Sequence, residues 1–313
     1  MKISVAMATY NGAEYIKEQL DSIRIQTRPV DEVIICDDQS KDNTVAVVQE
    51  YIKKYDLEAS WKVTVNPKNL GYASNFMGAV AKTSGDLIMF CDQDDIWLPE
   101  RVKEMEGLMQ AHPDMMLLGS EFEPFVSSEN AASVPEWELK QHKNDKSLEK
   151  KMFRPENIFI GCQGCTMCMR REFLDKTYSY WYAGWAHDEY AWKLALCLDG
   201  LYMYHAYTLR RRLHDANVSL SKMRDLPKRV KFLRALLDSH KKTLQFAKDI
   251  GMTEQQQKLL RRNIKATELR IDLLEKKKYW NTVKLALAYA DCYHKSRSIP
   301  VELYMAIKEK KTK

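Results

Sequence analysis

Residues 87–97 read Leu87-Ile88-Met89-Phe90-Cys91-Asp92-Gln93-Asp94-Asp95-Ile96-Trp97, and this stretch decides the fold. A short apolar run, typical of a buried strand, is followed at once by three carboxylates within four residues. In an open α/β sheet the carboxyl ends of the strands form the crevice where ligands bind. Carboxylates this close together repel one another, and oxygen ligands suit a hard divalent cation that neutralises them. The stretch therefore predicts a metal–nucleotide site at one edge of a sheet.

The residues before this stretch alternate between strand-like and helix-like patterns. Strands are expected at 3–8, 31–36, 61–65 and 86–90, and helices at 13–25, 44–52 and 71–81. This alternation predicts the α/β class, with a Rossmann-like, mostly parallel sheet, right-handed crossovers and helices on its faces.

Polar residues follow each expected strand, namely Thr9-Tyr10-Asn11, Asp37-Asp38, Asn69 with Gly71, and Asp92–Asp95. They should meet at one edge of the sheet, where the glycines allow the backbone to turn closely. Turn and cap chemistry accounts for some polar residues near these strands, such as Asp42 and Asn43. It accounts poorly for the acidic run.

The composition is that of a globular chain. Its 313 residues, 45% of them hydrophobic, are enough for a substantial core. No run approaches the ~20 apolar residues of a membrane span, and the N-terminal residues lack a signal-peptide pattern, so a cytoplasmic protein is expected. Seven irregularly spaced cysteines fit reduced thiols better than a disulfide framework.

The charge is uneven along the chain. Residues 221–313 carry 24 Lys and Arg against 10 Asp and Glu, a net charge of +14, so residues 1–220 carry −8 of the total of +6. The basic segment shows apolar residues at helical spacing and is expected to be a helical module. Its charge, its Trp280 and its tyrosines suit an anionic membrane surface, and the alternatives are a helix pair that packs on a protein partner or a merely solvated helix face. Nucleic acid is not expected as a partner, because aromatic residues are not interleaved with the basic clusters.

Four motifs in order resemble a family 2 glycosyltransferase of the GT-A fold: Ala8–Asn11, Asp37–Thr44, Asn69–Gly71 and Cys91–Trp97. The amino-acid sequence of the acidic block, Cys91–Trp97, is similar to that of bacterial rhamnosyltransferase-like members of the family. The resemblance implies a nucleoside-diphosphate sugar donor, either dTDP-rhamnose or a UDP-sugar, and Mg²⁺ or Mn²⁺ as cofactor.

The resemblance also implies roles for individual residues. Tyr10 and Asp38 would lie at the base of the nucleotide, Asp92 near its ribose and diphosphate, and Asp94 on the metal. Thr9, Asn11, Asn69 and Gly71 belong to the same donor-binding motifs.

Two later segments complete the implied site. In Trp185–Tyr190 an acidic pair precedes a helical run, and the dipole of a first turn explains such a pair without catalysis. The resemblance makes Asp188 the catalytic base, with Glu189 as the alternative. In Arg210–Ser219 it makes His214 a metal ligand and gives Arg212 to the diphosphate.

The cysteines at 162, 165 and 168 are not expected to hold a metal. In a strand the middle one would face away from the other two, and no fourth ligand is adjacent. The resemblance puts an acceptor-pocket strand here.

The expected organisation is a GT-A domain at 1–220, divided into a nucleotide-sugar half (1–118) and an acceptor half (119–220), and a basic helical module at 221–313. The expected function is inverting, metal-dependent transfer of a sugar, plausibly rhamnose, to a hydroxyl of a cell-surface glycan or lipid-linked saccharide. The absence of a Gln-x-x-Arg-Trp motif favours a single transfer per encounter. A catalytically silent nucleotide-sugar-binding scaffold subunit is the alternative.

Overall fold

The computed structural model describes residues 1–128, 131, 133–215, 225–295 and 298–308. The chain divides into two compact units, Met1–Met152 with Ile160–Leu220, and Phe153–Phe159 with Ser221–Lys313. The sequence did not predict that Phe153–Phe159 groups with the C-terminal helices. The expected boundary between residues 220 and 221 lies outside the described residues, and the two halves expected within 1–220 stay a prediction.

The first unit follows the expected alternation of strands and helices. Its elements are β1 (Ile3–Thr9), α1 (Ile16–Arg24), β2 (Glu32–Asp37), α2 (Thr44–Lys54), β3 (Trp61–Val65), α3 (Tyr72–Lys82), β4 (Leu87–Cys91), β5 (Ile96–Trp97), α4 (Arg101–Ala111), β6 (Leu117–Val126), α5 (Glu136–Leu139), β7 (Ser147–Lys150), β8 (Cys168–Arg170), α6 (Arg171–Thr177), α7 (His187–Cys197) and β9 (Leu201–Leu213).

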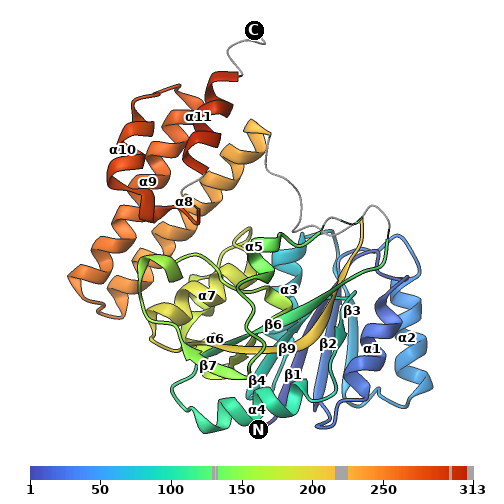
Figure 1. Ribbon diagram of the computed structural model, residues 1–313. Helices are drawn as coiled ribbons and strands as arrows, with labels where there is room; N and C mark the ends of the chain where they lie inside the picture. The colour runs from blue at the N-terminus through green and yellow to red at the C-terminus, as the bar shows by residue number, and fades with distance from the viewer. Residues whose placement is uncertain (129–130, 132, 216–224, 296–297, 309–313) are drawn as a thin grey trace. The chain divides into compact units, whose positions relative to one another are not determined.

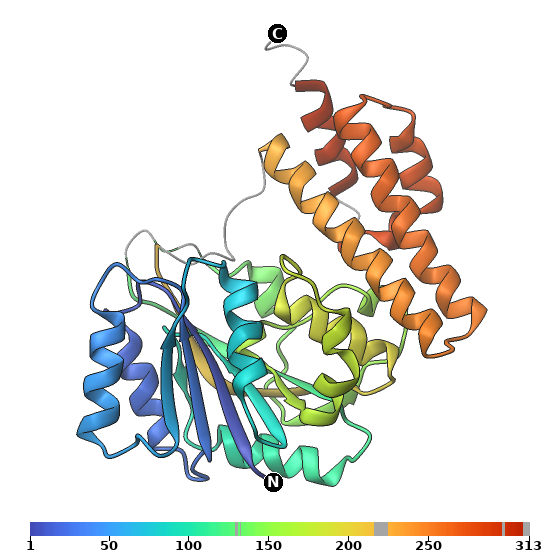
Figure 2. The same cartoon turned by 180° about the vertical axis from the view of Figure 1, so that it is seen from behind.

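Within the described residues, nine strands form one sheet in the order β3-β2-β1-β4-β8-β6-β9-β5, with β7 paired to β9 (Figure 1). The strands β3, β2, β1 and β4 are parallel, as predicted, and β8 pairs antiparallel with both β4 and β6. The sheet is therefore mixed rather than uniformly parallel. Helices flank it, with α3 and α7 on one face and α4 on the other (Figures 1 and 2).

The centre of the sheet is the most deeply buried part of the chain. In β1 and β4, Val5, Met7, Leu87 and Met89 are fully buried, because helices cover both faces of these strands. In the sheet register Thr9 pairs with Asp37, and Met7 pairs with Cys91. The loops that follow β1, β2 and β4 therefore start side by side.

The segment 161–169 corrects one expectation. Gly164–Thr166 forms a 3₁₀ turn, and β8 starts only at Cys168. The turn is closed by Thr166, whose hydroxyl donates to the carbonyl of Gln163 at 2.7 Å. The strand-based reason for setting Cys165 aside is therefore wrong.

The second unit is helical, with α8 (Leu226–Asp249), α9 (Glu254–Glu275), α10 (Asn281–Ala288) and α11 (Ser298–Lys308). Its α9 contacts the other three helices. Phe159 packs against their apolar core, and its ring centroid lies 6.1 Å from that of His240. No helix among the described residues is long and apolar enough to cross a membrane.

An ion cluster is buried in the same unit. Glu302 on α11 has no exposed surface and accepts hydrogen bonds from Arg270 at 2.8 Å, Arg229 at 2.7 Å and Tyr293 at 3.2 Å. Because burying a charge is costly unless it is paired, this cluster fixes how the helices pack.

Candidate active site

The acidic loop Asp92–Asp95 connects β4 to β5 and is anchored through the side chain of Asp95. Asp95 is 2% exposed, and its Oδ1 accepts the backbone N–H of Arg212 at 3.0 Å. Its Oδ2 is buried, and within the described residues it has no hydrogen bond of ordinary geometry, although the Cys165 thiol lies beside this carboxylate. A buried carboxylate oxygen in this state is well suited to a cation.

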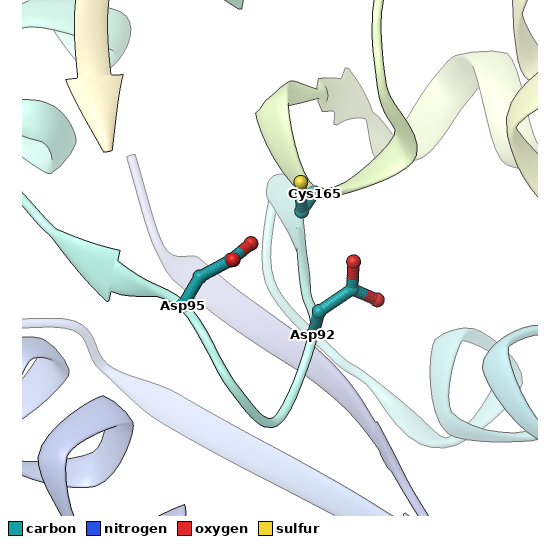
Figure 3. Close-up of side chains that lie close together, drawn as sticks. All are labelled: Asp92, Asp95 and Cys165. Carbon is teal, nitrogen blue, oxygen red and sulfur yellow. The ribbon is translucent and has the colours of Figure 1, made fainter. Parts of the chain in front are cut away.

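Three potential metal ligands gather at this loop. One ligand atom each of Asp92, Asp95 and Cys165 lie within 4.8 Å of one another (Figure 3). Burial raises the pKa of Asp92 well above its ordinary value, the charges of its acidic neighbours raise it further, and the guanidinium of Arg211 opposes the shift. Burial likewise raises the pKa of Asp95. The cluster is thus electrostatically unfavourable when no cation is bound.

The expected metal ligands Asp94 and His214 lie in direct contact. The Nε2 atom of His214 is 2.7 Å from the Oδ2 atom of Asp94. His214 directly follows β9, and its ring centroid lies 4.9 Å from that of Tyr15. Two segments more than a hundred residues apart therefore bring together one carboxylate and one imidazole, and their expected role as metal ligands stays a prediction.

Arg212 braces the acidic loop. Its Nε donates to the carbonyl of Asp94 at 2.9 Å, and its Nη2 donates to Glu18 at 2.7 Å. The guanidinium also lies over the ring of Tyr15, 4.6 Å from its centroid. With a side chain only 7% exposed, Arg212 is committed to these contacts. Its expected role toward a diphosphate stays a prediction.

Arg211 and Gln93 are two site residues that the sequence analysis did not select. Arg211 is 6% exposed, and its charge acts on both Asp92 and Asp95. Gln93 pairs with the backbone of Tyr10: its Oε1 accepts the N–H at 2.8 Å, and its Nε2 donates to the carbonyl at 3.0 Å. The place of Gln93 between the acidic residues was the available signal for its role.

The loop after β1 carries the residues expected to bind the donor. Thr9 donates its hydroxyl to Asp37 at 2.8 Å, and the Tyr10 side chain is 46% exposed. Asn11 adopts a φ of 50° and accepts the backbone N–H of Lys41 at 2.7 Å. An exposed aromatic ring on a braced loop is available to stack on a ligand.

Asp38 shapes the neighbouring loop that contains Asn69 and Gly71. Its carboxylate accepts the N–H groups of Leu70 at 2.7 Å and Gly71 at 2.8 Å, and the amide of Asn66 at 2.9 Å. Asn69 donates to the carbonyl of Asp38 at 3.0 Å. Gly71 has a φ of 80°, which suits glycine alone among common residues. Asp38 is 2% exposed, and its expected contact with a base stays a prediction.

The acidic pair at the start of α7 separates into two different environments. Glu189 bonds Lys193 at 2.6 Å, and the Lys193 side chain is only 1% exposed. Asp188 accepts the N–H of Glu189 at 2.7 Å. It also lies against Gly164, because a Cβ added to that glycine would be 3.2 Å from the Cβ of Asp188. The charge of Asp188 also raises the pKa of Asp92, so the two carboxylates act on each other electrostatically.

His187 anchors the start of α7. Its ring stacks on Phe76 with centroids 4.0 Å apart and meets Phe90 edge-on at 4.9 Å. Burial lowers its pKa, which favours the neutral imidazole. An added Cβ on Gly164 would be 2.6 Å from its Nε2, so glycine is needed for this close approach.

These residues fit a hard divalent cation. Carboxylate oxygens with one imidazole nitrogen suit Mg²⁺ or Mn²⁺, and the buried Oδ2 of Asp95 offers a further oxygen. Asp94 and His214, with Asp92 and Asp95 beside them, are the residues able to hold it. Cys165 is a poor ligand for such an ion, because burial raises the pKa of its thiol well above the ordinary value.

The mixed sheet and the acidic loop at its edge define a GT-A type of fold. The profile of Glycosyl transferase family 2 matches residues 4–177. The chain belongs to glycosyl transferase family 2, whose members transfer a sugar from a nucleotide-sugar donor.

Three known proteins illustrate the similarity. An uncharacterized glycosyltransferase of Nostoc sp. is 24% identical over 71% of this chain and 67% of its own length. The poly(ribitol-phosphate) beta-N-acetylglucosaminyltransferase TarS of Staphylococcus aureus is 33% identical over 38% of this chain and 20% of its own length. The match thus spans a fifth of the length of TarS.

Solved structures agree on the fold. Residues 1–349 of S. aureus TarS, in complex with UDP-GlcNAc, align with 100% of this chain and 92% of that chain at a TM-score of 0.63 and 18% identity. A mannosyltransferase from Pyrobaculum calidifontis, in complex with GDP-Man and Mn²⁺, aligns with 98% of this chain and 86% of that chain at a TM-score of 0.53 and 16% identity.

Proposed function

We propose that this chain transfers a sugar, with inversion, from a nucleoside-diphosphate sugar to a hydroxyl of a cell-surface glycan. The contact of Asp94 with His214, 2.7 Å apart beside the buried carboxylate of Asp95, carries the proposal. Membership of family 2 supports the reaction class. TarS, whose name gives poly(ribitol-phosphate) as its substrate, supports a cell-wall polymer as acceptor.

The reaction forms a bond between the acceptor oxygen and the anomeric carbon and breaks the bond from that carbon to the phosphate oxygen of the donor. The proton of the acceptor hydroxyl goes to a carboxylate, and the nucleoside diphosphate leaves with the bonding electron pair. A divalent cation bound by Asp94 and His214 would supply Lewis-acid stabilisation of that leaving group.

We assign the base to Asp188 rather than Glu189. The carboxylate of Glu189 is held by the ammonium of Lys193 at 2.6 Å, so it is already engaged in an ion pair. Asp188 accepts the N–H of Glu189 at 2.7 Å, and its charge acts on Asp92 of the acidic loop. A general base must reach the proton that it removes, within about 2.6–3.2 Å in a productive complex.

Two classes of nucleotide sugar are the proposed donors. The complex of TarS with UDP-GlcNAc makes UDP-sugars the first donors to test. The similarity of the acidic block to rhamnosyltransferases, seen in sequence alone, makes dTDP-rhamnose the second. Tyr10, Asn11 and the loop shaped by Asp38 are the proposed surroundings of the nucleotide.

The test measures release of nucleoside diphosphate from a panel of donors, with Mn²⁺ or Mg²⁺ and a poly(ribitol-phosphate) acceptor. Asp94→Ala should abolish release and weaken metal-dependent donor binding. Asp188→Asn should lower turnover about 10²–10⁴-fold while donor binding remains. Asp56→Asn is the matched control, because Asp56 is exposed after α2 with a φ of 53°, a conformation that asparagine tolerates.

Two results would count against the proposal. Donor binding by the unaltered chain without transfer to any glycan acceptor would favour the scaffold alternative. Full turnover by Asp94→Ala would remove the proposed metal site.

A further inference from the structure

One face of α10 is apolar and uncovered. Trp280, which directly precedes the helix, is 81% exposed, Leu287 is 84% exposed and Val283 is 47% exposed. These residues are three and seven positions apart, so they lie along one side of the helix. We call Trp280, Val283 and Leu287 the α10 face.

The opposite side of α10 holds the helix to its own unit. Leu285 is fully buried in the apolar core, and Asn281 donates to the carbonyl of Leu269 at 3.0 Å. The helix is thus fixed by its inner side, while its largest apolar side chains remain in water. A contiguous exposed apolar surface of this kind marks an interaction site.

The segment that carries the α10 face contains lysines and no acidic residue. Residues 276–290 contain Lys276, Lys277, Lys278 and Lys284 and no Asp or Glu. Lys284 follows Trp280 by one helical turn, so it lies on the same side of α10. Lys276 and Lys278 bond to Asp272 at 2.7 Å and 2.8 Å, which leaves the segment with a net positive charge.

The neighbouring helix α11 repeats the pattern. Val301 is 51% exposed and Tyr304 is 62% exposed, again three positions apart. Lys308 follows one turn later, with its Nζ 5.9 Å from the centre of the Tyr304 ring. The two contacting helices therefore both present apolar or aromatic side chains next to lysines.

We propose that the α10 face docks on the surface of an anionic lipid bilayer. Trp and Tyr rings favour the boundary between water and hydrocarbon, and lysines reach lipid phosphates while their stems lie along apolar surface. Each lysine near an anionic leaflet adds to the attraction. Pairing of two copies through this face would bring lysines of like charge together, which disfavours a self-interface. The proposal is independent of the sugar-transfer activity.

The test is flotation of the full chain with vesicles of phosphatidylcholine, with and without about 30% phosphatidylglycerol, at low and high salt. Binding should require the anionic lipid and weaken at high salt. The double variant Trp280→Ala, Leu287→Ala should lower the partition coefficient at least about tenfold. Lys284→Glu should lower it about fivefold or more.

Two controls separate docking from a folding defect. Ile250→Ala removes an exposed apolar side chain of the same unit away from α10, 38% exposed, and should bind as the unaltered chain does. Thermal unfolding should be unchanged in every variant, since the replaced side chains are exposed. Brominated lipids should quench part of the tryptophan fluorescence, and Trp280→Phe should remove that part.

Equal binding to neutral and anionic vesicles would overturn the proposal, as would no binding at all. Undiminished binding by the double variant would do the same. A dimer that the double variant dissociates would show that the face meets a second copy instead.

Discussion

Replacing Glu189 with Gln tests the assignment of roles in the acidic pair of α7. The substitution keeps the size of the side chain and removes the negative charge 2.6 Å from the Lys193 ammonium. Lys193 is 2% exposed, so its charge depends on that carboxylate for compensation. Removing one partner of a buried ion pair costs about 3–5 kcal/mol. We expect Glu189→Gln to lower the free energy of unfolding by this amount at neutral pH.

The loss should depend on pH in a defined direction. Burial lowers the pKa of Lys193, and the charge of Glu189 raises it in part. Without that charge the folded-state pKa falls further below the unfolded value of about 10.4. Over that interval the unfolded chain binds more protons than the folded chain, so stability rises with pH. The deficit of Glu189→Gln should therefore shrink as the pH rises from 7 toward about 10.

The assay combines urea unfolding with turnover of the folded protein. Glu189→Gln should keep its turnover within about threefold, whereas Asp188→Asn should lose about 10²–10⁴-fold. Lys193→Met added to Glu189→Gln should recover stability, because no buried ammonium is then left without its carboxylate. If Glu189→Gln is as stable as the parent and binds donor but transfers nothing, Glu189 is the base and the assignment fails.

Three further perturbations have definite expected outcomes. Asp38→Ala removes the acceptor of three hydrogen bonds, so it should lower the free energy of unfolding in urea by about 3 kcal/mol and weaken donor binding. Donor binding at the parent's level would show that the loop keeps its shape without Asp38. Gln93→Ala frees the loop after β1 and should raise the donor dissociation constant about tenfold by calorimetry; an unchanged constant would contradict its bracing role. Glu302→Ala should cost about 3–5 kcal/mol, because it leaves the buried Arg270 and the partly buried Arg229 without their carboxylate. Burial raises the pKa of Glu302, but the two arginines lower it more, so the folded-state pKa lies below the usual range. The contribution of Glu302 to the free energy of unfolding is therefore full above about pH 4.5 and is lost as the pH falls through the folded-state pKa. A stability difference between parent and variant that does not change with pH would refute this.

The α/β fold was predictable because its signals are local. Each central strand is a short apolar run followed by polar residues, and the helices between them show a helical period. The contact of Asp94 with His214 was predictable only through the family resemblance, since no local pattern relates residues so far apart in the chain.

Other features depend on tertiary contacts that a sequence pattern does not encode. The 3₁₀ turn at Gly164–Thr166 forms where the ring of His187 occupies the space of a missing side chain. The ion pair of Glu189 with Lys193 depends on the burial of that lysine, which the sequence pattern does not show. The sequence showed the basic run Arg210–Arg212, but not that Arg212 would be turned toward Glu18.

The grouping of Phe153–Phe159 with the C-terminal helices has a consequence for biosynthesis. During translation this segment leaves the ribosome well before the helices that begin at Leu226. Phe159 therefore stays exposed to solvent until the apolar core of those helices forms. A gene truncated after residue 220 would make that exposure permanent. Loss of solubility in such a product would result from the exposed segment and would not test binding to lipid. Point substitutions on α10 therefore test the membrane proposal better than a truncation does.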